Sequence, residues 1–199
     1  MTPIFIFPLI FPVTLPSPAP EAAPTVFSFV QEAPKIPEVP FYSQFKDIVS
    51  PKWKKVSCGI ASLAMVIDYY GTDEISANDL LKEGIEDGAY ISNAGWSHRG
   101  LVLLSEKHGM KGETYDLSNE TRREAFEFFV RQLKDGPAIV SVHYKMEPDN
   151  PIPHLVVING FDGDTIYYND PAAKTPAKEI SKQDFLKTWK KRFIVIRPA

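Results

Sequence analysis

Cysteine is nearly missing from this 199-residue sequence, which contains a single one, Cys58. One cysteine cannot form an internal disulfide, and it excludes the zinc sites that need several cysteines. Histidine is scarce as well, with four residues and no HExxH-type spacing, so the sequence predicts no metal site. An excess of positive charge is also absent, because the formal net charge is −3. The sequence therefore lacks the basic footprint of a nucleic-acid-binding protein, and no nucleic acid is expected as a partner.

The first forty residues contain no glycine and ten of the eighteen prolines, and their first Lys or Arg is Lys35. Residues 1–13 are strongly apolar, but prolines interrupt them and they are shorter than the ~20 residues of a membrane-spanning helix. They could be the apolar part of a secretory signal, although the basic leading segment is missing. We predict an apolar, Pro-rich, largely disordered segment and linker over 1–35, serving as a signal or an anchor for membrane association. The domain would span 36–199, and the protein would be exported or cell-envelope associated, otherwise cytoplasmic.

The clearest predicted helix carries Cys58 in its first turn. Apolar residues recur there at the three-and-four spacing of a buried helical stripe, at Ile60, Leu63, Ala64 and Ile67. Gly71 suits the left-handed residue that ends a helix. The unpaired N–H groups and the positive dipole end of the first turn favour a thiolate, which would make Cys58 a nucleophile. The alternative is a small core residue, which is a common role for a free cysteine.

Helical patterns predominate from Cys58 to residue 134, and strand patterns follow. Ser76, Ser118 and Ser181 are expected to cap helices that extend to about Ile85, over 120–134 and to about Trp189. Another helix is expected to begin near 101 and to stop at about 108–109. Segments rich in Val, Ile and Tyr predict strands over 138–144, 154–161, 165–169 and 193–196. Helices followed by an antiparallel sheet give an α+β fold class.

His154 opens one of these strands, and Asp170 follows the next one. The turn signal at 162–164 lies midway between them, so a hairpin would place His154 opposite residues 169–170, at a strand spacing of roughly 5 Å. A histidine oriented by a carboxylate and facing Cys58 is the arrangement that activates a thiol nucleophile. The alternative for Asp170 is a plain turn former before Pro171.

Gln44 precedes Cys58 by fourteen positions and could donate its side-chain N–H₂ to an oxyanion, together with the Cys58 backbone N–H. Taken alone, a loop glutamine is usually just solvated. Two other histidines compete with the assignment of His154. His143 is the stronger rival, because the strand alternation places it on the face opposite Val140 and Val142, whereas His98 lies beside a tryptophan that is expected to pack.

Four segments resemble the papain-like cysteine peptidases related to the bacteriocin-processing, double-glycine-leader peptidases. They are residues 57–66 (SCGIASLAMV), 135–140 (DGPAIV), 154–162 (HLVVINGFD) and 168–171 (YNDP). The resemblance covers about residues 39–197 and implies a papain-like fold, in which a helical half carrying the cysteine helix packs on an antiparallel sheet carrying His and Asp. Ile60 stands where that family often has proline, and residues 52–55 lengthen the spacing before Cys58.

For the site, the resemblance implies Cys58 as nucleophile, His154 as base and acid, Asp170 as third member and Gln44 as oxyanion glutamine. The expected activity is hydrolysis of peptide bonds in a peptide or protein substrate through a thioester, with no metal or organic cofactor. The leader-processing relatives are fused to a membrane exporter, whereas this sequence ends at Ala199 without a transporter segment, so a free-standing peptidase is expected here. Two alternatives remain: an acyl-transferase or cell-wall amidase using the same site, and a catalytically inactive peptide-binding module. The sequence leaves the oligomeric state open.

Overall fold

The computed structural model describes residues 36–71, 75–92 and 94–199, so the predicted signal or anchor segment over 1–35 lies outside the described residues. The helices are α1 (Cys58–Tyr69), α2 (Ala77–Glu86), α3 (His98–Glu106), α4 (Arg122–Leu133) and α5 (Lys182–Thr188). The strands are β1 (Tyr90–Ile91), β2 (Gly95–Trp96), β3 (Met110–Asp116), β4 (Ala138–His143), β5 (Pro153–Asp162), β6 (Thr165–Asn169), β7 (Lys178–Ser181) and β8 (Trp189–Pro198), and a 3₁₀ turn (Tyr144–Met146) follows β4. Within these ranges no helix has the length and apolar character needed to cross a membrane.

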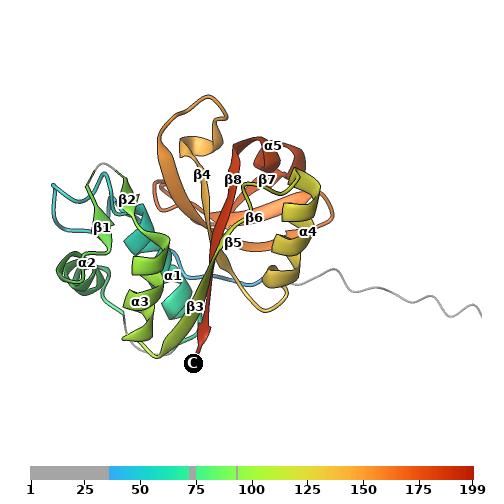
Figure 1. Ribbon diagram of the computed structural model, residues 1–199. Helices are drawn as coiled ribbons and strands as arrows, with labels where there is room; N and C mark the ends of the chain where they lie inside the picture. The colour runs from blue at the N-terminus through green and yellow to red at the C-terminus, as the bar shows by residue number, and fades with distance from the viewer. Residues whose placement is uncertain (1–35, 72–74, 93) are drawn as a thin grey trace, which may run out of the picture. The chain divides into compact units, whose positions relative to one another are not determined.

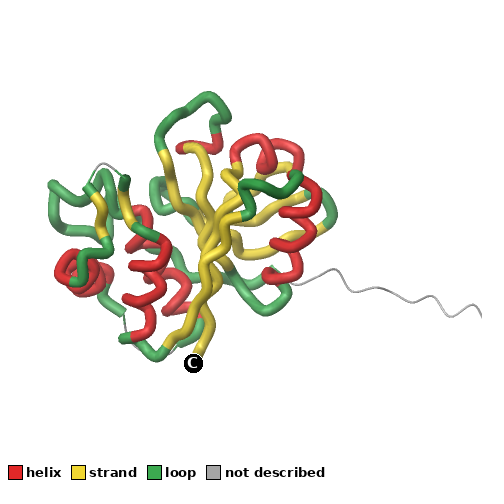
Figure 2. The backbone as a smooth tube through the Cα atoms, viewed as in Figure 1, coloured by secondary structure: helices red, strands yellow, loops and turns green. Residues whose placement is uncertain are grey.

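An antiparallel sheet in the order β3-β8-β4-β5-β6-β7 forms the centre of the fold, while β1 and β2 pair separately (Figure 1). Helices α1, α2 and α3 lie on one side of this sheet and α4 and α5 on the other, as the tube in Figure 2 also shows. The predicted α+β layout, in which the cysteine helix packs on an antiparallel sheet, is therefore confirmed, although β3 precedes α4 and α5 lies between β7 and β8 in the chain.

Alternation along the central strands builds a core on each face of the sheet. One face presents Ile139, Val157 and Ile194 to α1–α3, and the other presents Val140 and Phe193 to α4 and α5. Side chains of successive strand residues point to opposite faces, so a strand covered on both sides must be apolar at nearly every position. The continuous burial of β4 from Ala138 to Val142 follows from this two-sided packing.

The helix caps divide into confirmed and corrected predictions. Ser76 and Ser181 are N-caps whose side chains accept from the backbone three residues later. The prediction for Ser118 is wrong, because α4 begins only after Thr121, which forms a capping box with Glu124. That reciprocal pair satisfies two helix-end donors at once. Ser118 instead bonds Asp116 in the preceding loop.

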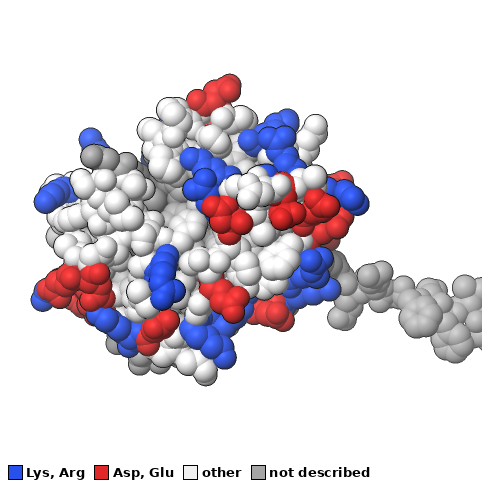
Figure 3. Space-filling view, in the orientation of Figure 1, with Lys and Arg blue, Asp and Glu red and all other residues white. Residues whose placement is uncertain are grey.

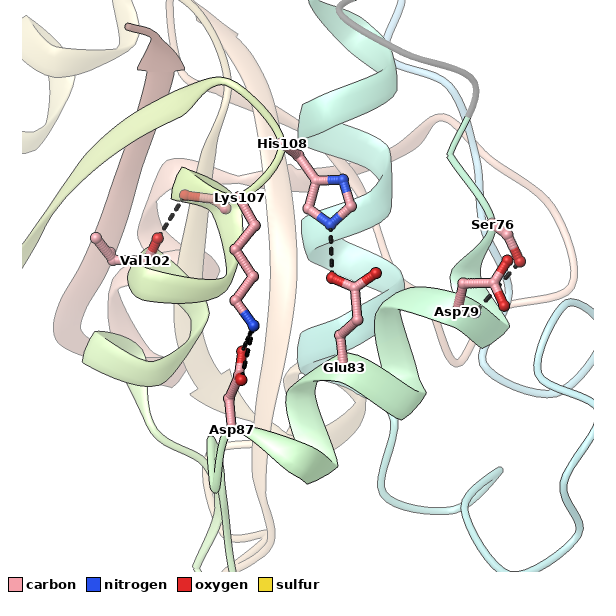
Figure 4. A network of polar contacts seen from close by, with 8 residues as sticks. Ser76, Asp79, Glu83, Asp87, Val102, Lys107 and His108 are labelled. Atoms are coloured by element: carbon pink, nitrogen blue, oxygen red, sulfur yellow. Dashed lines mark hydrogen bonds and ion pairs between the residues drawn. The ribbon is translucent and has the colours of Figure 1, made fainter.

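Helices α2 and α3 are joined at their C-terminal ends by a histidine–carboxylate hydrogen bond and an ion pair (Figure 4). His108 Nε2 lies 3.0 Å from a Glu83 carboxylate oxygen, and Lys107 Nζ lies 2.7 Å from Asp87 Oδ1. The basic groups sit where a helix C-terminus favours them. The Lys107–Asp87 pair lies at the surface, where an ion pair adds little free energy. On the face seen in Figure 3, basic and acidic side chains are interspersed.

Candidate active site

Cys58 is the first residue of α1, as predicted, and it is only partly buried although Gly59 to Ile67 behind it are fully enclosed. Hydrogen bonds hold the two residues that precede the helix, Val56 and Ser57. Ser57 Oγ donates to Trp53 O at 2.8 Å, and Trp96 Nε1 donates to Val56 O at 2.7 Å. A thiol thus stands at an anchored helix N-terminus, where backbone donors face it.

The surroundings of Cys58 stabilise its thiolate. Burial raises the pKa of the thiol, but the hydrogen bond and positive charge of His154 lower it, and backbone hydrogen bonds from Leu155 and Gly59 lower it further. The net result is a pKa below the ordinary value for cysteine. Because the thiolate is the nucleophilic form, this shift raises the reactivity of Cys58 at neutral pH.

His154 is the partner of that thiol. Its Nε2–H donates to Asp170 Oδ1 at 2.6 Å, and Nδ1 is left to face Cys58. The imidazole is 4% exposed. Burial lowers its pKa, but the hydrogen bonds to Asp170 and Cys58 and the charges of both raise the pKa to about 9. An imidazolium held between a thiolate and a carboxylate can both take and return a proton.

The pairing predicted for the hairpin is wrong in register, although it is right that His154 and Asp170 meet. Asn169 lies opposite Val157, not His154, because the hairpin turns at Gly163 and Asp164, where Asp162 pairs with Thr165, and not around the predicted midpoint at Asp162. A bulge between Ile158 and Gly160 then shifts the later pairs by only one residue. Asp170 therefore reaches His154 diagonally, from just beyond the paired part of β6.

Gln44 lies between the loop that enters α1 and the loop that follows Asp170. It is 2% exposed, its Nε2 donates to Lys54 O at 2.8 Å, and its backbone N–H donates to Pro171 O at 2.9 Å. Its Oε1 is buried without a hydrogen-bond partner among the described residues. The side-chain amide nitrogen of Gln44 carries two N–H groups, so one N–H remains free after the hydrogen bond to Lys54. These hydrogen bonds place Gln44 beside both loops of the site, but they do not join it to Cys58.

The rival histidines have other partners. His143 Nδ1 bonds Asn150 O at 2.6 Å within the loop after β4. His98 Nε2 lies 2.8 Å from Ser141 Oγ, and burial, followed by the charge of Arg192, lowers its pKa. Among the four histidines, His154 is the one whose contacts include Cys58 and a carboxylate.

Two aromatic residues at the site were not singled out for these contacts by sequence reasoning. Trp96 packs so closely on α1 that a Cβ on Gly59 would lie 2.8 Å from it. Tyr144 places its ring 5.1 Å from the His154 ring, centroid to centroid, at 88°. The Trp96 contact joins segments distant in sequence, and the Tyr144 contact depends on how the loop between β4 and β5 folds, so neither has a signal in the sequence pattern. The described residues hold no cluster of three potential metal ligands.

Comparison with protein families finds one match that covers most of the chain, the Peptidase_C39 like family, over residues 36–193. Among curated proteins, the pediocin PA-1 transport/processing ATP-binding protein PedD of Pediococcus acidilactici is 28% identical over 142 residues. That alignment covers 71% of this chain but 17% of PedD, so the chain corresponds to a small part of that relative's length.

Two solved structures share the fold. One is a double glycine motif protease from an AMS/PCAT transporter in complex with the leader peptide, with a TM-score of 0.56 and 23% identity, covering 82% of this chain and 94% of that one. The other is described as a C39-like peptidase from Bacillus anthracis, with a TM-score of 0.58 and 18% identity, covering 82% and 96%. At these identities the likeness concerns the fold.

Proposed function

Because this chain belongs to the Peptidase_C39 like family and is therefore a cysteine-type peptidase, we propose that Cys58, His154 and Asp170 form its catalytic triad. The observation that carries the proposal is the continuous chain of contacts from thiol to imidazole to carboxylate, with the 2.6 Å His154–Asp170 bond at its end. We further propose that residues 36–199 form the peptidase domain.

In the proposed reaction, Cys58 Sγ attacks the carbonyl carbon of the scissile peptide bond. The oxyanion that forms accepts hydrogen bonds from the Cys58 backbone N–H and from the free Nε2–H of Gln44. The C–N bond then breaks, and the His154 imidazolium gives its proton to the leaving amine. A thioester remains on Cys58.

Hydrolysis of the thioester uses the same groups. His154, now neutral, removes a proton from water, and the hydroxide adds to the thioester carbonyl. The C–S bond breaks, which releases the carboxylic acid and restores the thiolate–imidazolium pair. Throughout the cycle, Asp170 holds the imidazole in one tautomer and stabilises its charged form.

The substrate we propose is a peptide, and the first one to test is a leader peptide with a Gly-Gly junction. PedD is named as a transport/processing protein, and one of the structural relatives is a double glycine motif protease with its leader peptide. Export and membrane association through residues 1–35 stay predictions from the sequence.

The test uses the full chain with a synthetic Gly-Gly leader peptide and detects products by mass spectrometry. Cys58→Ala should abolish cleavage, and His154→Ala should lower the rate by about 10²–10⁴. His143→Ala is the control, because this histidine is the rival base, and it should retain activity. If Cys58→Ala cleaves as fast as the wild type, the proposed triad is refuted.

The alternatives give different results in the same experiment. An acyl-transferase would yield an amide product when a primary amine is added to compete with water for the thioester. An inactive peptide-binding module would retain the peptide uncleaved, and its Cys58 would react with iodoacetamide only at the pH of an ordinary thiol.

A further inference from the structure

We propose that Tyr144 is a positioning residue that holds the His154 imidazole in the plane in which it bonds both Cys58 and Asp170. This inference rests on the proposed triad. Among the described residues, Tyr144 has no hydrogen bond to the Cys58 thiol or the Asp170 carboxylate, so its effect would act through His154.

The ring contact is the first observation. The two ring centroids are 5.1 Å apart and the ring planes are nearly perpendicular, at 88°. That is a favourable edge-to-face geometry for two aromatic rings. An imidazole rotates about one bond, and a large ring packed at right angles against it obstructs that rotation. Because both ring nitrogens of His154 have partners, a small rotation would weaken both hydrogen bonds.

The second observation is the backbone that delivers Tyr144. Lys145 and Met146, which follow it, both have left-handed backbone angles, with φ values of 59° and 56°. Residues with a side chain adopt this region at a cost in free energy, and such positions gather at functional sites. Two in succession are needed here to turn the chain directly after β4.

The surrounding loop maintains this strained turn. Tyr144 N–H donates to Ile152 O at 3.0 Å, and His143 bonds Asn150 O across the same loop. Met146 Sδ lies 3.4 Å from Thr188 Oγ1, whose hydroxyl also has the Phe185 carbonyl oxygen at 3.0 Å. These contacts tie the turn to the segment just before β5 and to the end of α5. The fold thereby holds the ring of Tyr144 against His154, and the position of this ring does not depend on bound substrate.

The groups facing His154 define the pH readout. They are the Cys58 thiolate, the Asp170 carboxylate and the Tyr144 ring. The ammonium of Lys145 lies 5.9 Å from the centroid of the Tyr144 ring. Loss of the ring leaves all three charges in place. A change in the Cys58 pH profile would therefore report altered orientation of the imidazole.

The experiment measures the rate of Cys58 alkylation by iodoacetamide against pH in the full chain, for Tyr144→Phe and Tyr144→Leu. Tyr144→Phe keeps the ring and should match the wild type. Tyr144→Leu removes it, and the rate below pH 8 should fall about two- to tenfold, the worth of one aromatic pair. On a cleaved peptide, kcat should fall by the same factor with KM unchanged.

Tyr115→Leu is the matched control. Tyr115 lies on β3, and its ring likewise packs against another aromatic ring, that of Phe193. Its alkylation profile should not change. Equal rates for Tyr144→Leu and wild type would overturn the proposal, and so would a Tyr144→Phe variant as impaired as Tyr144→Leu. If Tyr144→Leu does not fold, the wild type decides: a missing nuclear Overhauser effect between the Tyr144 and His154 ring protons refutes the contact. His154→Ala tests the triad separately.

Discussion

Replacement of Asp170 by asparagine separates the charge of this residue from its geometry. Asp170 Oδ1 accepts from His154 Nε2 at 2.6 Å and from the Ala172 backbone N–H at 2.8 Å. Asparagine offers a carbonyl oxygen of nearly the same size at the same place, so both hydrogen bonds can persist. Only the negative charge is lost.

The size of the effect follows from the two kinds of hydrogen bond. A hydrogen bond to a charged group contributes about 1.5–3 kcal/mol and a neutral one about 0.5–1.5 kcal/mol, so Asp170→Asn should remove roughly 1–1.5 kcal/mol from the imidazolium. A change of about 1.4 kcal/mol corresponds to one pKa unit. The wild-type fold holds the pKa of His154 at about 9. The imidazolium of the variant would lose its proton about one pH unit earlier.

The direction of the shift in the His154 pKa can be read from the alkaline limb of the pH profile of cleavage. His154 is protonated below its pKa, so the ion pair with Cys58 exists from the lowered pKa of the thiol up to about pH 9 in the wild type and disappears as pH rises through that value. In Asp170→Asn this limb of the cleavage profile should move to lower pH by about one pH unit, so cleavage should slow by about five- to tenfold near pH 9–10, whereas at pH 7 the imidazolium keeps most of its proton in both proteins.

The assay is peptide cleavage from pH 5 to 11, supported by iodoacetamide alkylation of Cys58 at each pH. Asp162→Asn is the matched control, because it removes the same charge at the other end of β5. It should leave the limb in place. An Asp170→Asn profile identical to the wild type would mean that Asp170 serves only as a turn former, the alternative that its position before Pro171 suggests.

Two stability predictions follow from the backbone. Gly59→Ala should lower the free energy of unfolding by about 1–3 kcal/mol, since its Cβ would lie 2.8 Å from Trp96; an unchanged urea midpoint would show that the indole moves freely. Ala177→Gly should raise it by roughly 0.5–1 kcal/mol, because Ala177 has a φ of 54°. Ala173→Gly is its control and should lower stability by about 0.4–1 kcal/mol; equal losses in both variants would contradict the argument from strain.

The parts of the fold that were predicted from sequence have local causes. The helix that begins at Cys58 has apolar residues at helical spacing and a glycine stop at Gly71, and the caps at Ser76 and Ser181 depend on residues three positions away. The error at Ser118 was also local, because the stronger Thr121–Glu124 capping box stood three residues later in the same stretch.

Strands β3 and β7 were not predicted because they lie at the two edges of the sheet. Their sequences, MKGETYD and KEIS, contain charged residues and little apolar alternation. Natural edge strands often carry such charges, which discourage pairing with other chains. A strand of this kind is defined by the neighbour it pairs with, and the neighbour of β3 is β8, some 80 residues later.

The register of β5 and β6 shows how one residue connects the fold to the site. If the pairing of Val157 with Asn169 continued by two residues, Leu155 would face Pro171. Proline has no backbone N–H, so it cannot donate to the Leu155 carbonyl, and the ladder stops there. Ser62 of α1 donates to that carbonyl instead, at 3.3 Å, and the Leu155 backbone also bonds Cys58. The proline that ends β6 therefore opens this side of β5 to the cysteine helix, so the Asp-Pro pair contributes to the site through the proline as well as through the aspartate.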